Sequence, residues 1–270
     1  RPHCGRGPGG RMRHTLAMCQ LLGLNANTPT DLVFSFTGFA HRAEEHRDGF
    51  GIAFFEGPGV RLFVDHQGAT TSPVAEMIRR YPIHSRHIIA HIRKATQGRV
   101  ALENTHPFMR ELWGRYWVFA HNGNLVDFQP KLHAAFRPVG DTDSERAFCW
   151  LMQEISKCHA GVPSVAHLTQ TLAELVPPVA RHGTFNFLLS NGEALWAHCS
   201  TKLHYIERAH PFDSAQLQDE DLTVDFAAHT TPDDRVAVVV TEPLTCNEAW
   251  TAMAPGELLV FENGRRCPLA

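Results

Sequence analysis

Short apolar runs, some alternating with polar residues, dominate both ends of the chain. Bounded apolar runs of about four to eight residues are typical of strands. Two pairs predict hairpins: 51–55 with 60–64 around Glu56-Gly57-Pro58-Gly59, and 184–190 with 194–198 around Asn191-Gly192, a pair suited to a two-residue turn. The remaining predicted strands are 19–23, 87–91, 116–120, 235–240 and 257–261.

Helical periodicity is confined to the middle of the chain. A helix is predicted over 72–81, because proline suits the first helical position. A polar start followed by apolar residues at helical spacing predicts a second over 143–157. A third is predicted over 164–176, where Pro177-Pro178 should end it. Helices placed between groups of hairpins predict an α+β fold of antiparallel sheets covered by helices.

Composition places the chain among ordinary globular proteins. The 270 residues are 43% hydrophobic and 20% charged, which is ample for a buried core. A net charge of -3 argues against a nucleic-acid binder, and no apolar run approaches the ~18 residues of a membrane span. The seven cysteines form no C-x-x-C pair, so we expect no disulfide framework, no metal site and a cytoplasmic location. The acidic stretch 210–232 is expected to be a surface loop.

Residues 1–17 differ from the rest of the chain. They hold four arginines and no acidic residue, and no apolar signal region follows them. We therefore treat them as a leader, a tag, a mis-assigned start or a disordered basic arm, and expect residues 18–270 to form one domain. If the mature chain begins after Met18, Cys19 becomes its first residue.

A first-residue Cys19 would combine a nucleophile with a base. An α-amine has an ordinary pKa of about 7.7–8.0, so near neutral pH it can accept the thiol proton without a histidine. An inert buried role is nevertheless the commoner one for a lone cysteine. The position of Cys19 therefore matters more than its chemistry alone.

Three later segments could complete such a site. Arg93, in the segment 91–98 after a predicted strand, could clamp a carboxylate, although most arginines are simply solvated. Asn122 and Gly123, at the end of the predicted strand 116–120, could form an oxyanion hole or only a turn. Asp143 could bind a substrate ammonium, whereas the adjacent Asp141 and Thr142 equally suit helix capping.

The order of these motifs resembles that of the class II glutamine amidotransferases, which are N-terminal-nucleophile hydrolases, and most of all their stand-alone YafJ-type subgroup. The resemblance runs over 18–23, 48–53, 91–96, 121–123 and 142–145, and continues in 241–250. It implies a four-layer αββα sandwich without a cofactor.

The resemblance also implies a role for each residue. Cys19 would be the nucleophile, and Asn122 and Gly123 the oxyanion hole. Arg93 and Thr96 would bind the α-carboxylate of glutamine, and Asp143 its α-amine. Lys94 and Gln97 replace the Trp and His of sugar-amidating members, so lid behaviour and acceptor coupling should differ.

Glutamine hydrolysis to glutamate and ammonia is therefore the expected activity, with a separate ammonia-acceptor subunit as a possible partner. The alternatives are hydrolysis of another γ-glutamyl compound, an acylase for apolar amides, and a catalytically silent regulatory subunit. A metallohydrolase is disfavoured, because the eighteen histidines form no recognisable ligand cluster.

Overall fold

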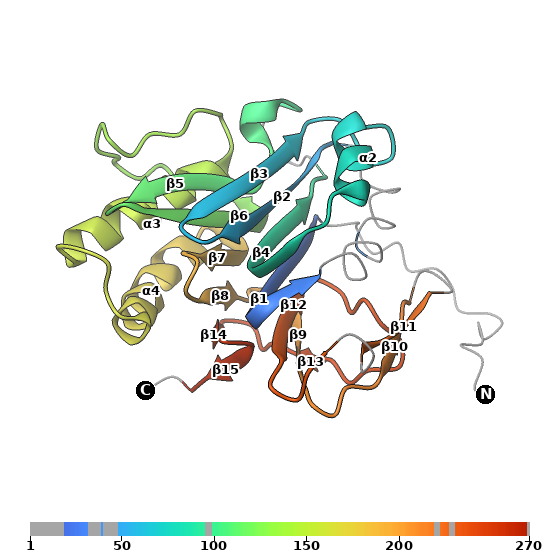
Figure 1. The fold of residues 1–270 in the computed structure, drawn as a ribbon. Coiled ribbons are helices and arrows are strands. Elements are labelled where there is room, and N and C mark those ends of the chain that lie inside the picture. The colour runs from blue at the N-terminus through green and yellow to red at the C-terminus, as the bar shows by residue number, and fades with distance from the viewer. Residues whose placement is uncertain are drawn as a thin grey trace, which may run out of the picture.

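A computed structural model describes residues 19–31, 39, 48–94, 99–218, 222–226 and 230–268. Two antiparallel sheets make up most of it (Figure 1). The larger has seven strands in the order β13–β9–β12–β1–β4–β2–β3. Their bounds in chain order are β1 (Gln20–Asp31), β2 (Phe50–Glu56), β3 (Gly59–Asp65), β4 (His84–Ile92), β9 (His204–Ala209), β12 (Arg235–Val240) and β13 (Thr251–Ala252).

The second sheet has six strands in the order β15–β14–β8–β7–β6–β5. Their bounds are β5 (Phe108–Leu112), β6 (Arg115–Leu125), β7 (Gly183–Ser190), β8 (Leu195–His198), β14 (Leu258–Glu262) and β15 (Arg265–Cys267). A separate two-stranded sheet pairs β10 (Ser214–Gln216) with β11 (Thr223–Asp225). The predicted loop over 210–232 was therefore wrong in part: Ala215 and Leu217 are buried and anchor a short hairpin there.

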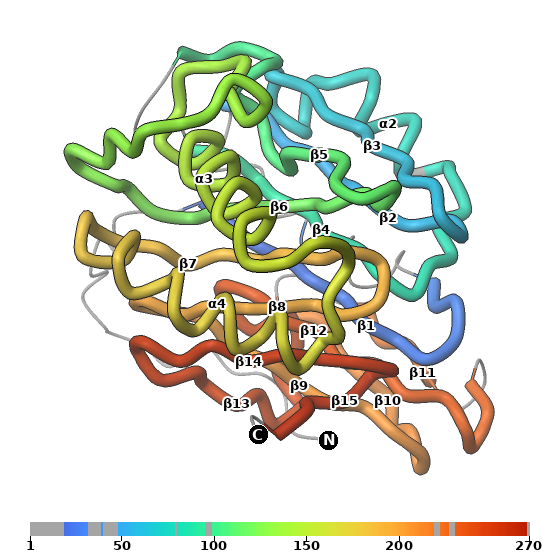
Figure 2. The backbone as a smooth tube through the Cα atoms, turned by 90° about the vertical axis from the view of Figure 1, so that its left-hand side faces the viewer, coloured from blue at the N-terminus to red at the C-terminus, as the bar shows by residue number. Residues whose placement is uncertain are grey.

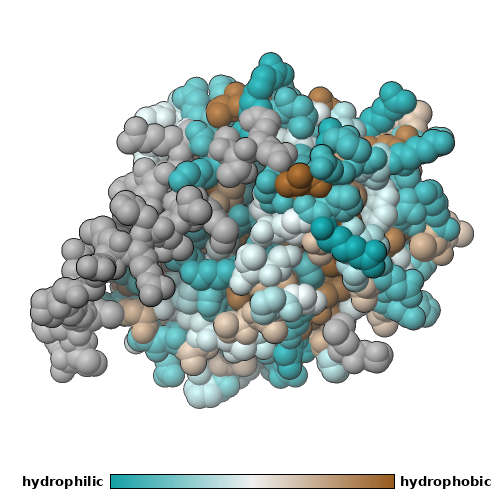
Figure 3. Space-filling model, turned by 180° about the vertical axis from the view of Figure 1, so that it is seen from behind, coloured by the Kyte–Doolittle hydropathy of each residue, from teal (hydrophilic) through white to brown (hydrophobic). Residues whose placement is uncertain are grey.

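Helices cover the outer faces of the two main sheets. α3 (Asp143–Cys158) and α4 (Val165–Ala180) lie over the six-stranded sheet (Figure 2), where their apolar faces pack on β5, β6 and β7. α2 (Pro73–Arg80) packs Ala75 and Ile78 against the outer face of the seven-stranded sheet. This order of layers is the αββα sandwich that the family resemblance implies, in the α+β class that the sequence pattern predicts. Seen from behind, the surface is mostly hydrophilic, with small scattered apolar patches (Figure 3).

The layer between the sheets is built from alternate positions of facing strands. Leu21 of β1 points into it, while Leu22 points to the outer face, as the two-residue period of a strand requires. Leu188 and Leu195 come from the opposite sheet. The sheets approach closely at Gly23, where an added Cβ would lie 3.0 Å from a methyl carbon of each of these two leucines. The absence of a side chain at Gly23 therefore lets Leu188 and Leu195 pack directly against β1.

Two predicted helix starts are confirmed by their caps. The Ser72 hydroxyl accepts backbone N–H groups of α2, and the Thr142 hydroxyl accepts the N–H of Glu145 in α3. The predicted end of α4 was wrong, because Pro177 and Pro178 lie inside its last turn. Val179, beyond both prolines, continues the buried face of the helix, and its packing offsets the missing backbone donors.

Two details of the predicted strands also differ. The second hairpin has a four-residue loop, because Ser190 pairs with Leu195, and the Asn191 side chain accepts the N–H groups of Glu193 and Ala194. β6 continues to Leu125 instead of ending at residue 120. A side-chain acceptor and a neighbouring strand, neither visible in the local pattern, account for these two differences.

Candidate active site

Three strands of the larger sheet bring their ends together at one point. Gln20 of β1 and Phe50 of β2 both pair with Ile92 of β4. The residues one step beyond, Cys19, Gly49 and Arg93, therefore lie side by side. The Arg93 N–H donates to the Gly49 carbonyl at 2.8 Å, which extends the β2–β4 ladder to this edge. The register of the sheet thus places two sequence-predicted site residues next to each other.

The Cys19 sulfur is half-buried and held by the backbone of Lys94. Its Sγ lies 3.1 Å from both the N–H and the carbonyl oxygen of that residue. Burial raises the pKa of the Cys19 thiol, the Lys94 N–H and the charge of Arg93 oppose this, and Asp48 adds to it. The thiol consequently remains mostly protonated at neutral pH and requires a base before it can act as a nucleophile.

Asn122 reaches Cys19 from the opposite sheet. Its side-chain amide donates to the Cys19 carbonyl, and its own backbone carbonyl accepts the amide of Asn186 at 3.1 Å. Asn186 is fixed in turn by the N–H groups of Ser200 and Thr201. The prediction that Asn122 and Gly123 follow a strand was wrong, because both lie within β6, paired with Asn186 and Phe185 of β7. The alternative interpretation of Asn122 and Gly123 as turn residues was therefore also wrong.

Gly123 occupies a position where no side chain fits. A Cβ there would lie 1.9 Å from the Thr184 carbonyl oxygen and 2.6 Å from Nε2 of His121. The His121 ring is itself fixed, with Nδ1 at 2.8 Å from the Ser144 hydroxyl and Nε2 at 3.0 Å from the same carbonyl oxygen of Thr184. The Thr184 backbone and the His121 ring therefore enclose the glycine. Moving either one would break the hydrogen bonds that hold it in place.

Gly123→Ala is accordingly expected to lower the free energy of unfolding by roughly 3 kcal/mol, because overpacking forces the backbone apart. Chemical denaturation of both proteins measures the change. Gly161→Ala is the matched control, since Gly161 has no atom within 4 Å of its added Cβ. Equal stability of the two variants would contradict the close approach at position 123.

Arg93 is a buried cation at this edge, with 3% of its surface exposed. Burial lowers the pKa of its guanidinium, and the nearby acidic groups of Cys19, Asp48 and Asp141 counter the effect. Its Nη1 donates to the carbonyl of Arg99 at 3.1 Å. The guanidinium is thus anchored on one side by a backbone carbonyl within the loop that follows β4.

Asp143 begins α3 and is tied to the strand that carries Asn122. Its Oδ2 accepts the N–H of Leu125, the last residue of β6, at 2.7 Å. Thr142, the preceding residue, caps the helix, so the capping interpretation holds for Thr142. Asp143 is buried near the same end of β6 as Asn122 and Gly123, and a carboxylate there can receive a cationic group. Thr96, the other sequence-predicted binding residue, lies outside the described residues.

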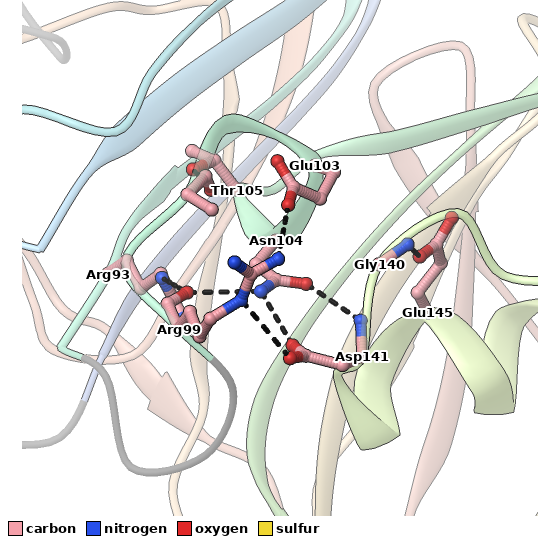
Figure 4. Close-up of polar contacts among 9 residues, drawn as sticks. Arg93, Arg99, Glu103, Asn104, Thr105, Gly140, Asp141 and Glu145 are labelled. Atoms are coloured by element: carbon pink, nitrogen blue, oxygen red, sulfur yellow. Dashed lines mark hydrogen bonds and ion pairs between the residues drawn. The ribbon is translucent and has the colours of Figure 1, made fainter.

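Asn104 went unnoticed in the sequence, whereas Asp141 was considered only for helix capping and Asp48 only as part of a motif. Asn104 and Asp141 form a polar cluster with the loop carbonyl that holds Arg93 (Figure 4). Asp48 acts electrostatically on both Cys19 and Arg93. The motif 48–53 pointed to Asp48, but backbone contacts and paired loops leave no side-chain signature in a single sequence.

A histidine pair lines the interior beneath this edge. The rings of His91 and His106 lie 4.4 Å apart, and both residues are buried. Burial, followed by the charges of His91, His121 and Arg93, holds the pKa of His106 well below its ordinary value. A neutral His106 ring therefore avoids adding further positive charge near Arg93.

The described residues contain no group of three or more His, Cys, Asp or Glu side chains placed to hold a metal ion. Within the same ranges, no helix is both long enough and apolar enough to cross a bilayer.

Comparison with known proteins gives one consistent family. The profile of the class II glutamine amidotransferases matches residues 18–269. A Haemophilus influenzae protein, provisionally assigned as a glutamine amidotransferase, is 51% identical over 252 residues, covering 92% of this chain and 86% of that protein. The Escherichia coli protein YafJ, with the same provisional assignment, is 49% identical over 253 residues, covering 92% and 99%.

Solved structures agree at the level of the fold. A crystal structure of a predicted glutamine amidotransferase from Pseudomonas aeruginosa has a TM-score of 0.75 and 44% identity, covering 93% of this chain and all of that one. The glutamine phosphoribosylpyrophosphate amidotransferase of B. subtilis, solved with ADP and GMP, has a TM-score of 0.57 and 15% identity, covering 92% and 48%. The second likeness concerns the fold alone.

Proposed function

The chain belongs to the class II glutamine amidotransferases, and we propose that it cleaves the γ-carboxamide of glutamine with Cys19 as nucleophile, giving glutamate and ammonia. One observation carries the proposal: a half-buried thiol, an amide donor and a buried guanidinium meet at one sheet edge. Asn122 touches Cys19 directly, and Arg93 lies beside Cys19 in the sheet and contributes to the electrostatics of its thiol. Acyl transfer requires a nucleophile and an oxyanion donor, and an amino-acid substrate adds the need for an anion clamp.

The first half of the reaction forms a thioester. The α-amine of Cys19 removes the thiol proton, and the thiolate attacks the γ-carboxamide carbon. The negative charge on the former carbonyl oxygen is held by the Asn122 amide and the Gly123 N–H, for which the Asn122 amide turns from the Cys19 carbonyl to the substrate. The C–N bond then breaks, and the ammonium of Cys19 gives its proton to the departing nitrogen, which leaves as ammonia.

The second half regenerates the enzyme. The same α-amine takes a proton from a water molecule, and the resulting hydroxide attacks the γ-glutamyl thioester carbon. The C–S bond breaks, and the released thiolate recovers its proton from the Cys19 ammonium. Glutamate then leaves, and no redox partner or metal takes part in this balance.

The amino-acid end of the substrate would be bracketed by opposite charges. The Arg93 guanidinium suits the α-carboxylate, with Thr96 beside it, and the Asp143 carboxylate suits the α-ammonium. The burial of Arg93 and Asp143 supports this, because a buried charge is stabilised by a partner of opposite sign. The bracket leaves the γ-amide free to face Cys19. A separate subunit that accepts the ammonia is part of the same proposal.

A chain that begins at Cys19 is expected to release ammonia from glutamine, whereas one that retains Met18 is expected to be inactive. A peptide nitrogen cannot accept the thiol proton, and burial already raises the pKa of that thiol. Activity should rise with pH towards about 8 as the α-amine loses its proton. Coupled ammonia detection on both proteins, with intact mass to verify the first residue, measures this.

A substrate panel separates the alternatives, with aniline release measured for the anilide and ammonia release for the other compounds. Glutamine, a γ-glutamyl anilide, asparagine and hexanamide differ in the position of the amide and in the amino-acid end. Cleavage of only the first two supports the bracket, and the rate ratio between them shows whether the leaving group is ammonia or a larger amine. Preference for hexanamide would overturn the proposal in favour of an acylase. Full activity with Met18 attached would overturn the role of the amine.

A further inference from the structure

Asn104 ends the short 3₁₀ helix η2 (Leu102–Asn104) and is completely buried. Its Nδ2 donates to Oδ1 of Asp141 at 2.6 Å and to the carbonyl of Arg99 at 3.0 Å. Its Oδ1 accepts the N–H of Asp141 at 3.0 Å. The side chain thus binds two loops, one following β4 and the other preceding α3, and both polar atoms of its amide take part (Figure 4).

The close approach of the two loops is built into the backbone. A Cβ at Gly140 would lie 2.1 Å from Oδ1 of Asn104 and 2.8 Å from the carbonyl oxygen of Glu103. Only glycine therefore permits this contact. The turn that presents Asn104 is closed by the Thr105 hydroxyl, which donates to the carbonyl of Ala101 at 3.0 Å. The contact is a specific junction and not an incidental meeting of surface loops.

One atom joins this junction to the proposed substrate bracket. The carbonyl oxygen of Arg99 accepts both Nδ2 of Asn104, at 3.0 Å, and Nη1 of Arg93, at 3.1 Å. On the other side, Asp141 precedes Asp143 by two residues, and only the helix cap Thr142 lies between them. Asn104 is therefore one hydrogen bond away from the anchor of Arg93 and two residues away from Asp143.

We propose that Asn104 is a positioning residue that fixes Arg93 and Asp143 relative to each other, so that the site accepts an α-amino acid by the spacing of its carboxylate and ammonium. The inference rests on the proposed function and adds to it. Asn104 touches no reacting atom, and it acts by holding the Arg99 carbonyl and the residue that leads into α3. Its contribution belongs to recognition of the amino-acid end and not to the chemistry at Cys19.

Asn104→Ala is expected to raise KM for glutamine about five- to tenfold, the effect of one or two lost hydrogen bonds, and to leave kcat within about twofold. The rate of Cys19 alkylation by iodoacetamide, which carries no amino-acid end, should not change. The rate with the glutamine-like electrophile 6-diazo-5-oxo-norleucine should fall by the same factor by which KM rises. A merely structural role would lower stability and move both alkylation rates together.

Asp141 supplies the second pair of variants, in case Asn104→Ala folds poorly. Asp141→Ala removes the acceptor of the Asn104 amide and should raise KM in the same direction. Asp141→Asn keeps an acceptor oxygen and should return KM towards the wild-type value. Glu103→Gln, which alters only an ion pair with the exposed Arg99 side chain at 3.1 Å, is the matched control and should leave KM unchanged.

The outcomes are separable from those of the proposed function. A wild-type protein beginning at Cys19 that cleaves no γ-glutamyl compound would overturn the function and this inference with it. A wild-type protein that is active, combined with an unchanged KM in both Asn104→Ala and Asp141→Ala, would overturn the inference alone. A fall in kcat with an unchanged KM would also overturn it, because the junction would then serve the chemical step.

Discussion

Replacing Cys19 by alanine is expected to abolish ammonia release from glutamine, with kcat falling by at least about 10⁴-fold. The fall is this large because, in the proposed mechanism, the covalent intermediate forms on this sulfur. The fold should persist, since the side chain is half-buried and its described contacts are made to the backbone of one residue, Lys94. A stopped assay over several hours, at high enzyme concentration, sets the lower limit of the remaining rate.

Cys158→Ala is the matched control for this loss. Cys158 is the last residue of α3 and is exposed, so its removal should change neither kcat nor the unfolding temperature. Mass spectrometry after treatment with the glutamine-like electrophile should find the adduct on Cys19 in the wild type and none in Cys19→Ala. Substantial turnover by Cys19→Ala would remove the nucleophile from the proposed mechanism.

Asn122→Ala is expected to lower kcat by about 10²- to 10³-fold while changing KM little, because the lost donor acts on charge that develops only in the transition state. In this structure, the Asn122 amide donates to the Cys19 carbonyl, so the donor already lies beside the proposed nucleophile. Steady-state kinetics on the protein that begins at Cys19 give both constants. A rise in KM with an unchanged kcat would instead make Asn122 a ground-state binding residue.

A second asparagine provides the comparison. Asn247 is exposed, and its amide hydrogen-bonds the backbone around β10, so Asn247→Ala should retain the wild-type kcat. Circular dichroism on both variants shows whether Asn122→Ala keeps its fold. The backbone of Asn122 is held by the β6–β7 ladder and by Asn186, which supports a folded variant.

The fold was predictable where local signals and burial agree. The hairpin 51–64 and the helix beginning at 73 carry their own turn and cap residues, and the structure confirms both. Predictions failed where residues far along the chain determine the local conformation. Pro177 and Pro178 remain helical because Val179 packs on a sheet whose strands come from elsewhere in the chain. Asn122 looked like a turn residue because β7, its pairing partner, begins some sixty positions later.

Some residues of the candidate site could likewise be predicted from the sequence, and others could not. Cys19 and Arg93 could be singled out by residue type and order, and their adjacency then follows from the sheet register. The Lys94 backbone contacts could not be anticipated, because any residue carries the same N–H and carbonyl groups. Asn104 lacked a signal for a related reason: its role depends on a loop that returns from residue 141, which no local spacing reports.

The narrow interior at Gly23 has a consequence for how this protein can evolve. Cys19 and Asn122 belong to opposite leaves of the sandwich, so the thickness of the layer between the leaves sets their separation. A methyl group added at Gly23 would lie 3.0 Å from methyl carbons of Leu188 and Leu195, so these side chains would have to shift within the layer. Packing changes in this layer, made far from Cys19 and Asn122, are therefore expected to alter the contact between these two residues.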